Sequence, residues 1–103
     1  MERIRELISE CTGFEWDSGN LYKNWIAHNV YYFEIEQAII NRPIVLLEDV
    51  GHSRGEERFS ALGSTDANRL LAIVFTVRGD QIRPISGRDM NLEEKRLFYE
   101  EGY

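Results

Sequence analysis

The residues of this sequence best suited to chemistry are a histidine, His28, and three arginines, Arg58, Arg83 and Arg88. A histidine side chain can accept or donate a proton near neutral pH. An arginine presents a planar fork of N–H donors that matches the oxygens of a phosphate group. Together these residue types favour chemistry on a phosphate. Taken singly, the more ordinary interpretation is a half-buried structural histidine and three surface arginines.

Cleavage of RNA without a metal would use such a set. The 2′-hydroxyl must lose a proton, the charge that grows on the phosphate must be stabilised, and the leaving 5′-oxygen must gain a proton. Arginine serves the second need but is a poor acid, because its pKa lies above about 12. A histidine or lysine is therefore required for at least one proton transfer. We find no glycine-rich phosphate loop and no metal-ligand motif, and we expect no cofactor.

The charge of the chain is unevenly distributed. The net charge is −6, which disfavours non-specific binding to a long polyanion. Residues 52–88 nevertheless carry six basic and four acidic side chains, a net charge of +2. All six basic residues there are arginines: Arg54, Arg58, Arg69, Arg78, Arg83 and Arg88. A local site for one or two phosphates is therefore compatible with an acidic protein.

The elements that must position these residues follow from periodicity and turn chemistry. We predict helices over 2–10, 18–28, 32–41 and 92–101, the last with Asn91 and Glu94 as a capping box. Strands are predicted over 14–16, 44–48, 58–62, 70–77 and 81–86, with the most apolar, 70–77, in the centre. Short connections between the last four strands favour a small antiparallel sheet of four to five strands packed by helices, an α+β fold.

Three local predictions bear on the candidate site. In the helix over 18–28, capped by Asp17 or Ser18, we expect Leu21, Tyr22, Trp25 and Ile26 to form the apolar face. Lys23 and position 27 lie opposite, with Asn24 and His28 at the edge. Residues 51–55 are predicted to be a loop, and 78–80 a tight turn. Pro84 has no N–H group, so its strand should be at an edge or bulged.

Four segments, in order, resemble the BrnT family of type II toxins. They are Phe14-Glu15-Trp16-Asp17, Asn24-Trp25-Ile26-Ala27-His28-Asn29, Glu56-Glu57-Arg58 with Leu62-Gly63, and Arg83-Pro84-Ile85-Ser86-Gly87-Arg88. The resemblance covers about residues 14–99. It implies a RelE-like ribonuclease fold in a single domain, with 14–101 as the core and 1–13 as a helical extension.

The resemblance also implies roles for individual residues. His28, Arg58, Arg83 and Arg88 match residues expected to be catalytic, and Asn24 matches an asparagine expected to bind substrate. We also expect Lys23 and Arg78 to bind substrate. Position 27, where the family has lysine, is Ala27. Asn29 replaces a glycine, a mild change because asparagine also tolerates a left-handed helix end. Gly87 replaces an alanine.

The implied function is RNA cleavage that arrests growth, without a metal. The implied partner is a BrnA-type ribbon-helix-helix antitoxin in a two-plus-two assembly that contacts DNA only through the antitoxin. Ala27 leaves two explanations open: a natural toxin that is attenuated or inactive, or a lysine replaced deliberately so that a toxic protein could be produced. The competing hypotheses are a binding module that tunes a DNA-binding antitoxin, and an ordinary α+β domain. A single cysteine, Cys11, and the absence of a signal peptide or a membrane-length apolar run lead us to expect a cytoplasmic protein.

Overall fold

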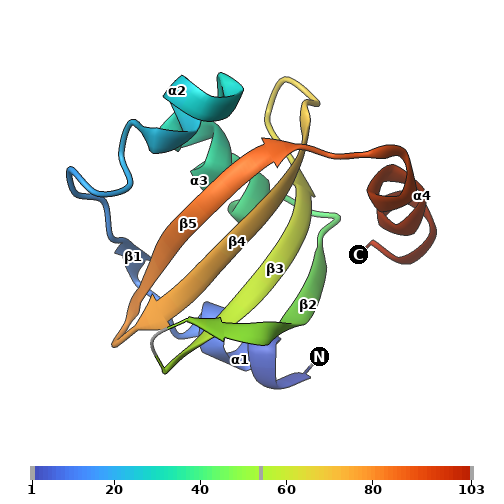
Figure 1. Ribbon diagram of the computed structural model, residues 1–103. Helices are drawn as coiled ribbons and strands as arrows, with labels where there is room; N and C mark the ends of the chain where they lie inside the picture. The colour runs from blue at the N-terminus through green and yellow to red at the C-terminus, as the bar shows by residue number, and fades with distance from the viewer. Residues whose placement is uncertain (1, 54, 103) are drawn as a thin grey trace.

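The structure, a computed structural model, is an open sheet with helices on both faces (Figure 1). It describes residues 2–53 and 55–102, together with their side chains except those of residues 2 and 49–53, so Arg54 lies outside the described residues. The elements in chain order are α1 (Glu2–Ser9), β1 (Gly13–Phe14), α2 (Lys23–His28), α3 (Tyr32–Ile40), β2 (Val45–Ser53), β3 (Glu56–Ser64), β4 (Leu70–Arg78), β5 (Gln81–Asp89) and α4 (Leu92–Glu101). Among the described residues, no helix has the length and apolarity to cross a membrane.

The sheet has five strands in the order β1-β5-β4-β3-β2. Strands β2 to β5 form an antiparallel meander, as predicted, with β4 in the centre. The short β1 pairs with the start of β5 in the parallel direction, which makes the sheet mixed. The predicted α+β class is confirmed.

One face of the sheet packs on α1 and α3, which lie behind it in Figure 1. Ile35 and Ile39 of α3 are buried against Ile73 and Phe75 of β4, and burial of such side chains contributes roughly 1.5–3 kcal/mol each. Gly63 of β3 allows the helix to come this close: a Cβ atom at this position would lie 2.1 Å from the carbonyl oxygen of Ala38.

Helix α4 packs on one end of the opposite face. Phe98 and Met90 are buried there with Val45, Leu62 and Ala72 of three strands. The predicted capping box begins this helix: the side chain of Asn91 accepts from Glu94 N, and the carboxylate of Glu94 accepts from Asn91 N. The rest of that face is free of helices in Figure 1.

Helix α2 differs from its prediction. It begins at Lys23, not at residue 18, because the Asp17 carboxylate accepts from Gly19 N in a local turn and does not cap a helix. The predicted apolar face is wrong as well. The residue of α2 that is buried is Asn24, whereas Trp25 and Ile26 are exposed. This short helix runs along the edge of the sheet, where a polar side chain can satisfy the backbone of β5.

Two strand predictions have different outcomes. The expected bulge at Pro84 is confirmed: Val74 pairs with Ser86 but Phe75 pairs with Pro84, so Ile85 is an extra residue in β5. The predicted loop over 51–55 is wrong in part, because β2 continues to Ser53 beyond a register shift after residue 49. At a bulge the strand bends and its pairing with the neighbouring strand then resumes. The loop-like composition of residues 51–55 does not reveal that the pairing resumes.

Candidate functional site

The bulge in β5 places two of the candidate arginines on one face of the sheet. Residues 83 and 88 are five apart, and in a regular strand their side chains would point to opposite faces. With Ile85 inserted, Arg83 pairs with Thr76 and Arg88 pairs with Ala72 of β4. Thr76 and Ala72 are four apart, so they share a face, and directly paired residues do too. Arg83 and Arg88 therefore lie on the same side.

Arg58 joins them from β3. Ser60 pairs with Val74, so Arg58, two residues earlier, lies on the same face as Thr76 and Arg83. We call the face that carries Arg58, Arg83 and Arg88 the arginine face; it lies opposite α1 and α3. From strand spacing, the backbones of Arg58 and Arg83 are about 10 Å apart, and those of Arg83 and Arg88 about 13 Å apart along the strand.

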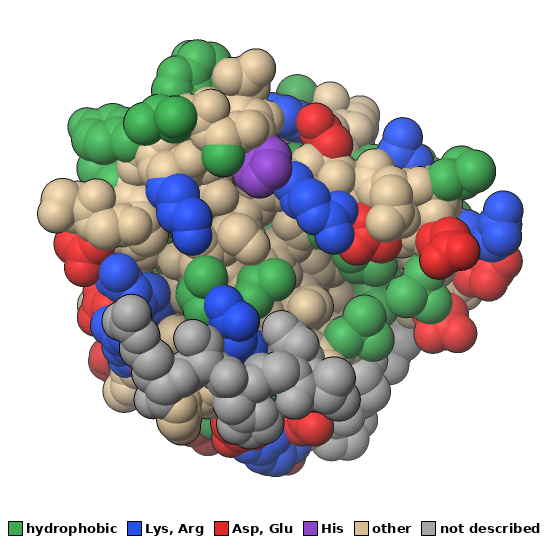
Figure 2. All heavy atoms as spheres, in the orientation of Figure 1, with side chains coloured by type: hydrophobic (Ala, Val, Ile, Leu, Met, Phe, Trp, Pro, Cys, Tyr) green, Lys and Arg blue, Asp and Glu red, His purple; other side chains and the backbone are tan. Residues whose placement is uncertain are grey.

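The floor between these arginines consists of small side chains. Ser60, Val74 and Ser86 lie there, and with the α4 residues Glu94 and Leu97 they line a hollow of about 150 Å³. Figure 2 views this face and shows basic side chains distributed over it, with a histidine side chain among them in the upper part of the view. A sheet floor of this kind is accessible to an extended polyanion strand.

Carboxylates neutralise Arg83 and Arg88. Arg83 is 15% exposed and donates to Asp17 Oδ2 at 2.9 Å and to Glu15 Oε1 at 3.0 Å. Arg88 makes a forked pair with Glu94, at 2.7 and 3.0 Å. The hydrogen bonds from Arg83, with a further one from the N–H of Gly19, lower the pKa of Asp17 below its usual value. Arg88 lowers the pKa of Glu94 in the same way.

Arg78, at the end of β4, is also paired. It donates to both oxygens of Glu56 at 2.9 Å and to Glu15 Oε1 at 3.2 Å. Glu15 thus accepts from Arg78 and Arg83 together, which joins the two cations in one ion-pair cluster at the hairpin end of the sheet.

Arg58 differs from these three. Within the described part of the chain its guanidinium has no hydrogen-bond or ion-pair partner, and its Nε atom is buried. A buried guanidinium N–H without an acceptor is costly, and a bound anion would supply the missing acceptor. Arg58 is therefore the cation of this face best placed to receive a phosphate.

Helix α2 places the remaining candidate residues beside the outer edge of β5. Lys23 is exposed, and its Nζ lies 3.4 Å from the carbonyl oxygen of Ile85. Ala27, one turn later, and His28, the last residue of the helix, are exposed as well. The helix ends at Asn29 in the left-handed conformation, with φ 55°, as the sequence predicted.

Asn24 is held inside the fold. It is 2% exposed, and its Oδ1 accepts from the backbone N–H of Gly87 at 2.9 Å, next to Arg88 in the chain. Asn20 similarly donates to the carbonyl oxygen of Pro84 at 3.0 Å. These side chains take the place that a neighbouring strand would occupy along β5. The contact of Asn24 that the structure shows is thus with the strand that carries Arg88.

Arg69, to which no sequence pattern assigned a role, fixes the end of α2. Its guanidinium donates to the carbonyl oxygens of Asn29 at 2.9 Å and of His28 at 3.4 Å. It also pairs with Asp89 at 2.8 Å and with Glu34 at 3.1 Å. Arg69 therefore joins α2, α3 and β5 behind His28. Its partners are up to 41 positions away in the sequence, so no local pattern identifies it.

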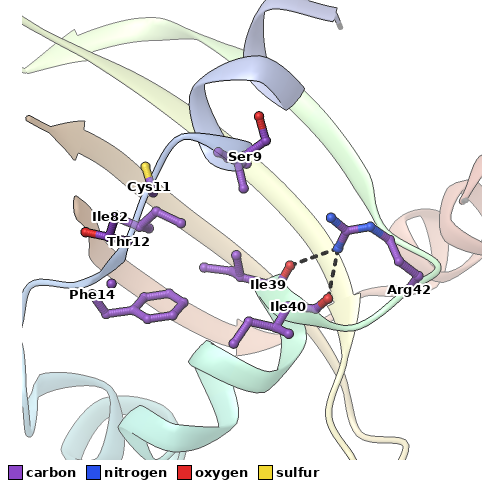
Figure 3. Close-up of a pocket in the computed structure, with 10 residues that line it drawn as sticks. Ser9, Cys11, Thr12, Phe14, Ile39, Ile40, Arg42 and Ile82 are labelled. Carbon is purple, nitrogen blue, oxygen red and sulfur yellow. Dashed lines mark hydrogen bonds between the residues drawn. The ribbon is translucent and has the colours of Figure 1, made fainter. Parts of the chain in front are cut away.

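A larger hollow, of about 320 Å³, lies between α1, β1 and α3 (Figure 3). Its lining is mostly apolar and includes Ile8, Phe14 and Ile39. Arg42 is the charged residue among those that line it. Its guanidinium donates to the carbonyl oxygens of Ile39 at 3.2 Å and Ile40 at 3.0 Å, as the dashed lines show. Because these carbonyl oxygens at the end of α3 already bind the guanidinium of Arg42, the hollow is a weaker phosphate site than the arginine face.

Comparison with known proteins identifies one family. The model of the family described as "Ribonuclease toxin, BrnT, of type II toxin-antitoxin system" matches residues 16–94. This range includes α2, α3, the meander and the beginning of α4, and with them every candidate site residue. Comparison with curated proteins gives no match.

Proposed function

The chain belongs to the BrnT family of ribonuclease toxins of type II toxin–antitoxin systems, and we propose that it acts on RNA at the arginine face. The observation that carries this proposal is Arg58, a cation with a buried, unsatisfied N–H in the described part of the chain. It lies on a face that Arg83 and Arg88 share. A scissile phosphate bound to Arg58 would rest on the small side chains of the sheet floor.

In the proposed mechanism His28 carries one of the two proton transfers, and water carries the other in the absence of a lysine at position 27. As a base, its imidazole takes the proton of the ribose 2′-hydroxyl while that oxygen attacks the phosphorus and water protonates the leaving 5′-oxygen; as an acid, it protonates the 5′-oxygen while water takes the 2′-hydroxyl proton. Arg58 stabilises the charge that grows on the phosphate, and Arg83 and Arg88 bind the flanking backbone. None of these steps requires a metal ion. Lys23 and Arg78 extend the site toward neighbouring phosphates, and Asn24 supports it by holding the strand of Arg88.

Ala27 limits the activity that we propose. A lysine at this position would stand beside His28 on the exposed side of α2 and would supply a second proton donor or phosphate contact. Removing one transition-state donor costs on the order of 10²–10³ in rate. We therefore propose an attenuated ribonuclease whose activity is restored by Ala27→Lys.

A second candidate function is a catalytically inactive module that binds and tunes an antitoxin. The ion pairs favour it: Arg83 and Arg88 are both neutralised by carboxylates, so the arginine face carries less net positive charge than the sequence suggests. In this case RNA would bind weakly, and the retained property would be the protein interaction.

Cleavage of a labelled single-stranded RNA separates the two functions. The chain, Ala27→Lys, and Ala27→Lys combined with His28→Ala or Arg58→Ala are compared with and without a metal chelator. We expect Ala27→Lys to cleave 10²–10³ times faster than the unmodified chain, with or without chelator. Each second substitution should return the rate to background. Arg96→Ala, an exposed arginine on α4, is the matched control and should change nothing. Absence of cleavage by Ala27→Lys would favour the binding module.

The family implies a protein antitoxin as partner. We propose that this antitoxin is a ribbon-helix-helix protein, that the complex contains two copies of each chain, and that DNA is contacted only by the antitoxin. We also propose that the whole chain is one domain and acts in the cytoplasm. The mass of the purified complex by light scattering tests the stoichiometry, and a gel shift with each component alone tests which one binds DNA.

A further inference from the structure

The outer side of α2 and the start of α3 carry large apolar side chains that are exposed. We call them the aromatic surface: Tyr22, Trp25, Ile26, Tyr31, Tyr32 and Phe33. Tyr22 is 64% exposed, Ile26 is 82% exposed, and the other four are 39–45% exposed. Figure 2 shows hydrophobic side chains gathered where Figure 1 places α2.

The rings of this surface are ordered against one another. Trp25 stacks on Tyr31 with centroids 4.1 Å apart, and Tyr31 stacks on Phe33 at 5.2 Å, with planes 16° and 13° apart. Tyr32 meets the edge of Phe33 at 5.8 Å. A rigid stack of rings loses little conformational entropy when a partner binds, which suits a binding surface.

The area is large enough for a protein partner. At about 200 Å² per side chain, the exposed fractions leave on the order of 600 Å² of apolar side chain in contact with water. That lies at the upper end of the largest patch on an ordinary monomer, about 300–600 Å². It approaches the roughly 800 Å² that one protein contributes to a standard interface.

The charges around the aromatic surface favour a protein over RNA. Residues 22–33, which carry this surface, contain one cation, Lys23, whose Nζ lies 3.4 Å from the carbonyl oxygen of Ile85, whereas stacking sites for RNA combine aromatic rings with a groove of cations along the backbone. Two carboxylates adjoin the aromatic surface. Glu34 accepts from the N–H of Tyr31, and Glu36 accepts from Trp16, whose ring meets Tyr32. Of the four carboxylates in residues 14–36, Glu15, Asp17 and Glu34 pair with arginines, so Glu36, which makes no ion pair among the described residues, and the net charge of −6 are what favour a basic partner. The matching partner surface is apolar with lysine or arginine beside it.

We propose that the aromatic surface is where the protein antitoxin docks, through an apolar segment flanked by basic residues. Trp25 and His28 are three residues apart on α2, so a partner that covers Trp25 also covers the imidazole. Docking here would block the arginine face at its rim. That consequence rests on the proposed ribonuclease site, whereas the docking itself rests only on the family's protein partner and on the exposed surface.

Affinity measurements test the docking. The probe is the purified protein encoded by the gene beside that of this chain, titrated calorimetrically into the full chain at low and high salt. We expect Ile26→Asp to weaken binding at least tenfold and Tyr22→Ala several-fold. Leu92→Asp is the matched control, because Leu92 is a 72% exposed apolar residue on α4, and it should bind within twofold of the unmodified chain. Binding should weaken as salt rises, since the flanking contacts are ionic.

Several results would overturn the docking proposal. One is no binding of the probe to the unmodified chain, and another is loss of binding in Leu92→Asp but not in Ile26→Asp.

If the surface is instead an RNA platform, Ile26→Asp will weaken and Ile26→Lys will strengthen binding of an uncleavable 2′-deoxy oligonucleotide, with antitoxin affinity unchanged. If it joins two copies of this chain, the free chain will be a dimer that Ile26→Asp dissociates, again with antitoxin affinity unchanged. Loss of RNA cleavage alone, with the affinities as expected, contradicts the ribonuclease and leaves the docking intact.

Discussion

Replacing Arg69 by alanine removes the cation that fixes the end of α2. In the folded protein this guanidinium holds the carbonyl oxygens of His28 and Asn29 and the carboxylates of Glu34 and Asp89. Alanine retains the backbone but leaves these acceptors without their donor. The last carbonyls of a helix have no partner within the helix, so the loss acts directly on the residue that we propose as acid or base.

The size of the effect follows from the exposure of each contact. The pair with Asp89 is largely in solvent, 63% exposed on the aspartate side, and should contribute about 0.5 kcal/mol. The pair with Glu34, which is 17% exposed, and the bond to the Asn29 carbonyl are more enclosed and should contribute about 0.8 kcal/mol each. We expect Arg69→Ala to lower the free energy of unfolding by about 2 kcal/mol, which corresponds to roughly 8 °C or more in Tm.

The loss should also depend on pH. Arg69 lowers the pKa of Asp89 below its usual value of 3.8 in the folded protein, so the pair stabilises the fold above that pH. As the pH falls below about 4, Asp89 takes up a proton and this stabilisation disappears. The difference in unfolding free energy between the unmodified chain and Arg69→Ala should therefore be largest near pH 7. It should narrow as the pH approaches 3.

Urea unfolding followed by circular dichroism at several pH values measures both effects. Arg96→Ala removes the same charge from an exposed position on α4 and serves as the control. Hydrogen exchange adds a local measurement, because the N–H of Asn29 bonds to the carbonyl of Trp25 and should exchange faster when the end of α2 loosens. Arg69 does not position His28 if the free energies of unfolding of Arg69→Ala and Arg96→Ala differ by less than about 0.5 kcal/mol and the N–H of Asn29 exchanges at the same rate in both variants.

Three further substitutions test separate parts of the fold and site. Glu94→Gln keeps the capping box but frees Arg88, so an uncleavable oligonucleotide should bind roughly threefold tighter, the effect of one charge at ~6 Å in water. Gly63→Ala should destabilise the fold by about 3 kcal/mol in thermal unfolding, because the new Cβ would lie 2.1 Å from the carbonyl oxygen of Ala38. Asn24→Ala should cost about 1–3 kcal/mol, since it leaves a buried N–H of β5 unpaired.

Each of the three has a contrasting result. Equal oligonucleotide affinity in Glu94→Gln and the unmodified chain would mean that Arg88 does not face the RNA. Gly13→Ala is the control for the glycine change, because the nearest atom to its Cβ is 3.9 Å away, and equal Tm values for the two alanine variants would contradict the close packing of α3. An Asn24→Ala variant with unchanged stability but weaker RNA binding would make Asn24 a direct substrate contact.

The sequence predicted most of the scaffold because those signals are local. Asn91 and Glu94 are three residues apart, and the helix that they cap begins where expected. The central strand is predicted by its apolar run, and the bulge by the missing N–H group of Pro84. Each of these signals also lies within a single segment of the sequence. The prediction for α2 was wrong because two local signals there are outweighed by contacts with β5. Asp17 pairs with Arg83, 66 positions away, and Asn24 satisfies the backbone of Gly87, 63 positions away.

The candidate site was predictable in its residue types but not in its charge balance. The shared face of Arg83 and Arg88 depends on one inserted residue, so it can be inferred only when the pairing with β4 is known. The carboxylates that neutralise these arginines come from the segment before α2 and from α4. Arg58 differs from Arg83 and Arg88 through contacts that it lacks among the described residues, a property that no sequence pattern carries.

The covering of the outer edge of β5 has a consequence for association between molecules. Past its short pairing with β1, three carbonyl oxygens and one N–H of this strand are bonded by Glu15 N, Asn20, Lys23 and Asn24. A free strand edge invites a second chain to add a strand, which leads to domain swapping or fibrous aggregates. Here asparagine and lysine side chains fill that edge without offering a new ladder of hydrogen bonds. A partner that approaches from this side therefore meets side chains at the four backbone groups of Ile82, Pro84, Ile85 and Gly87 that are already bonded.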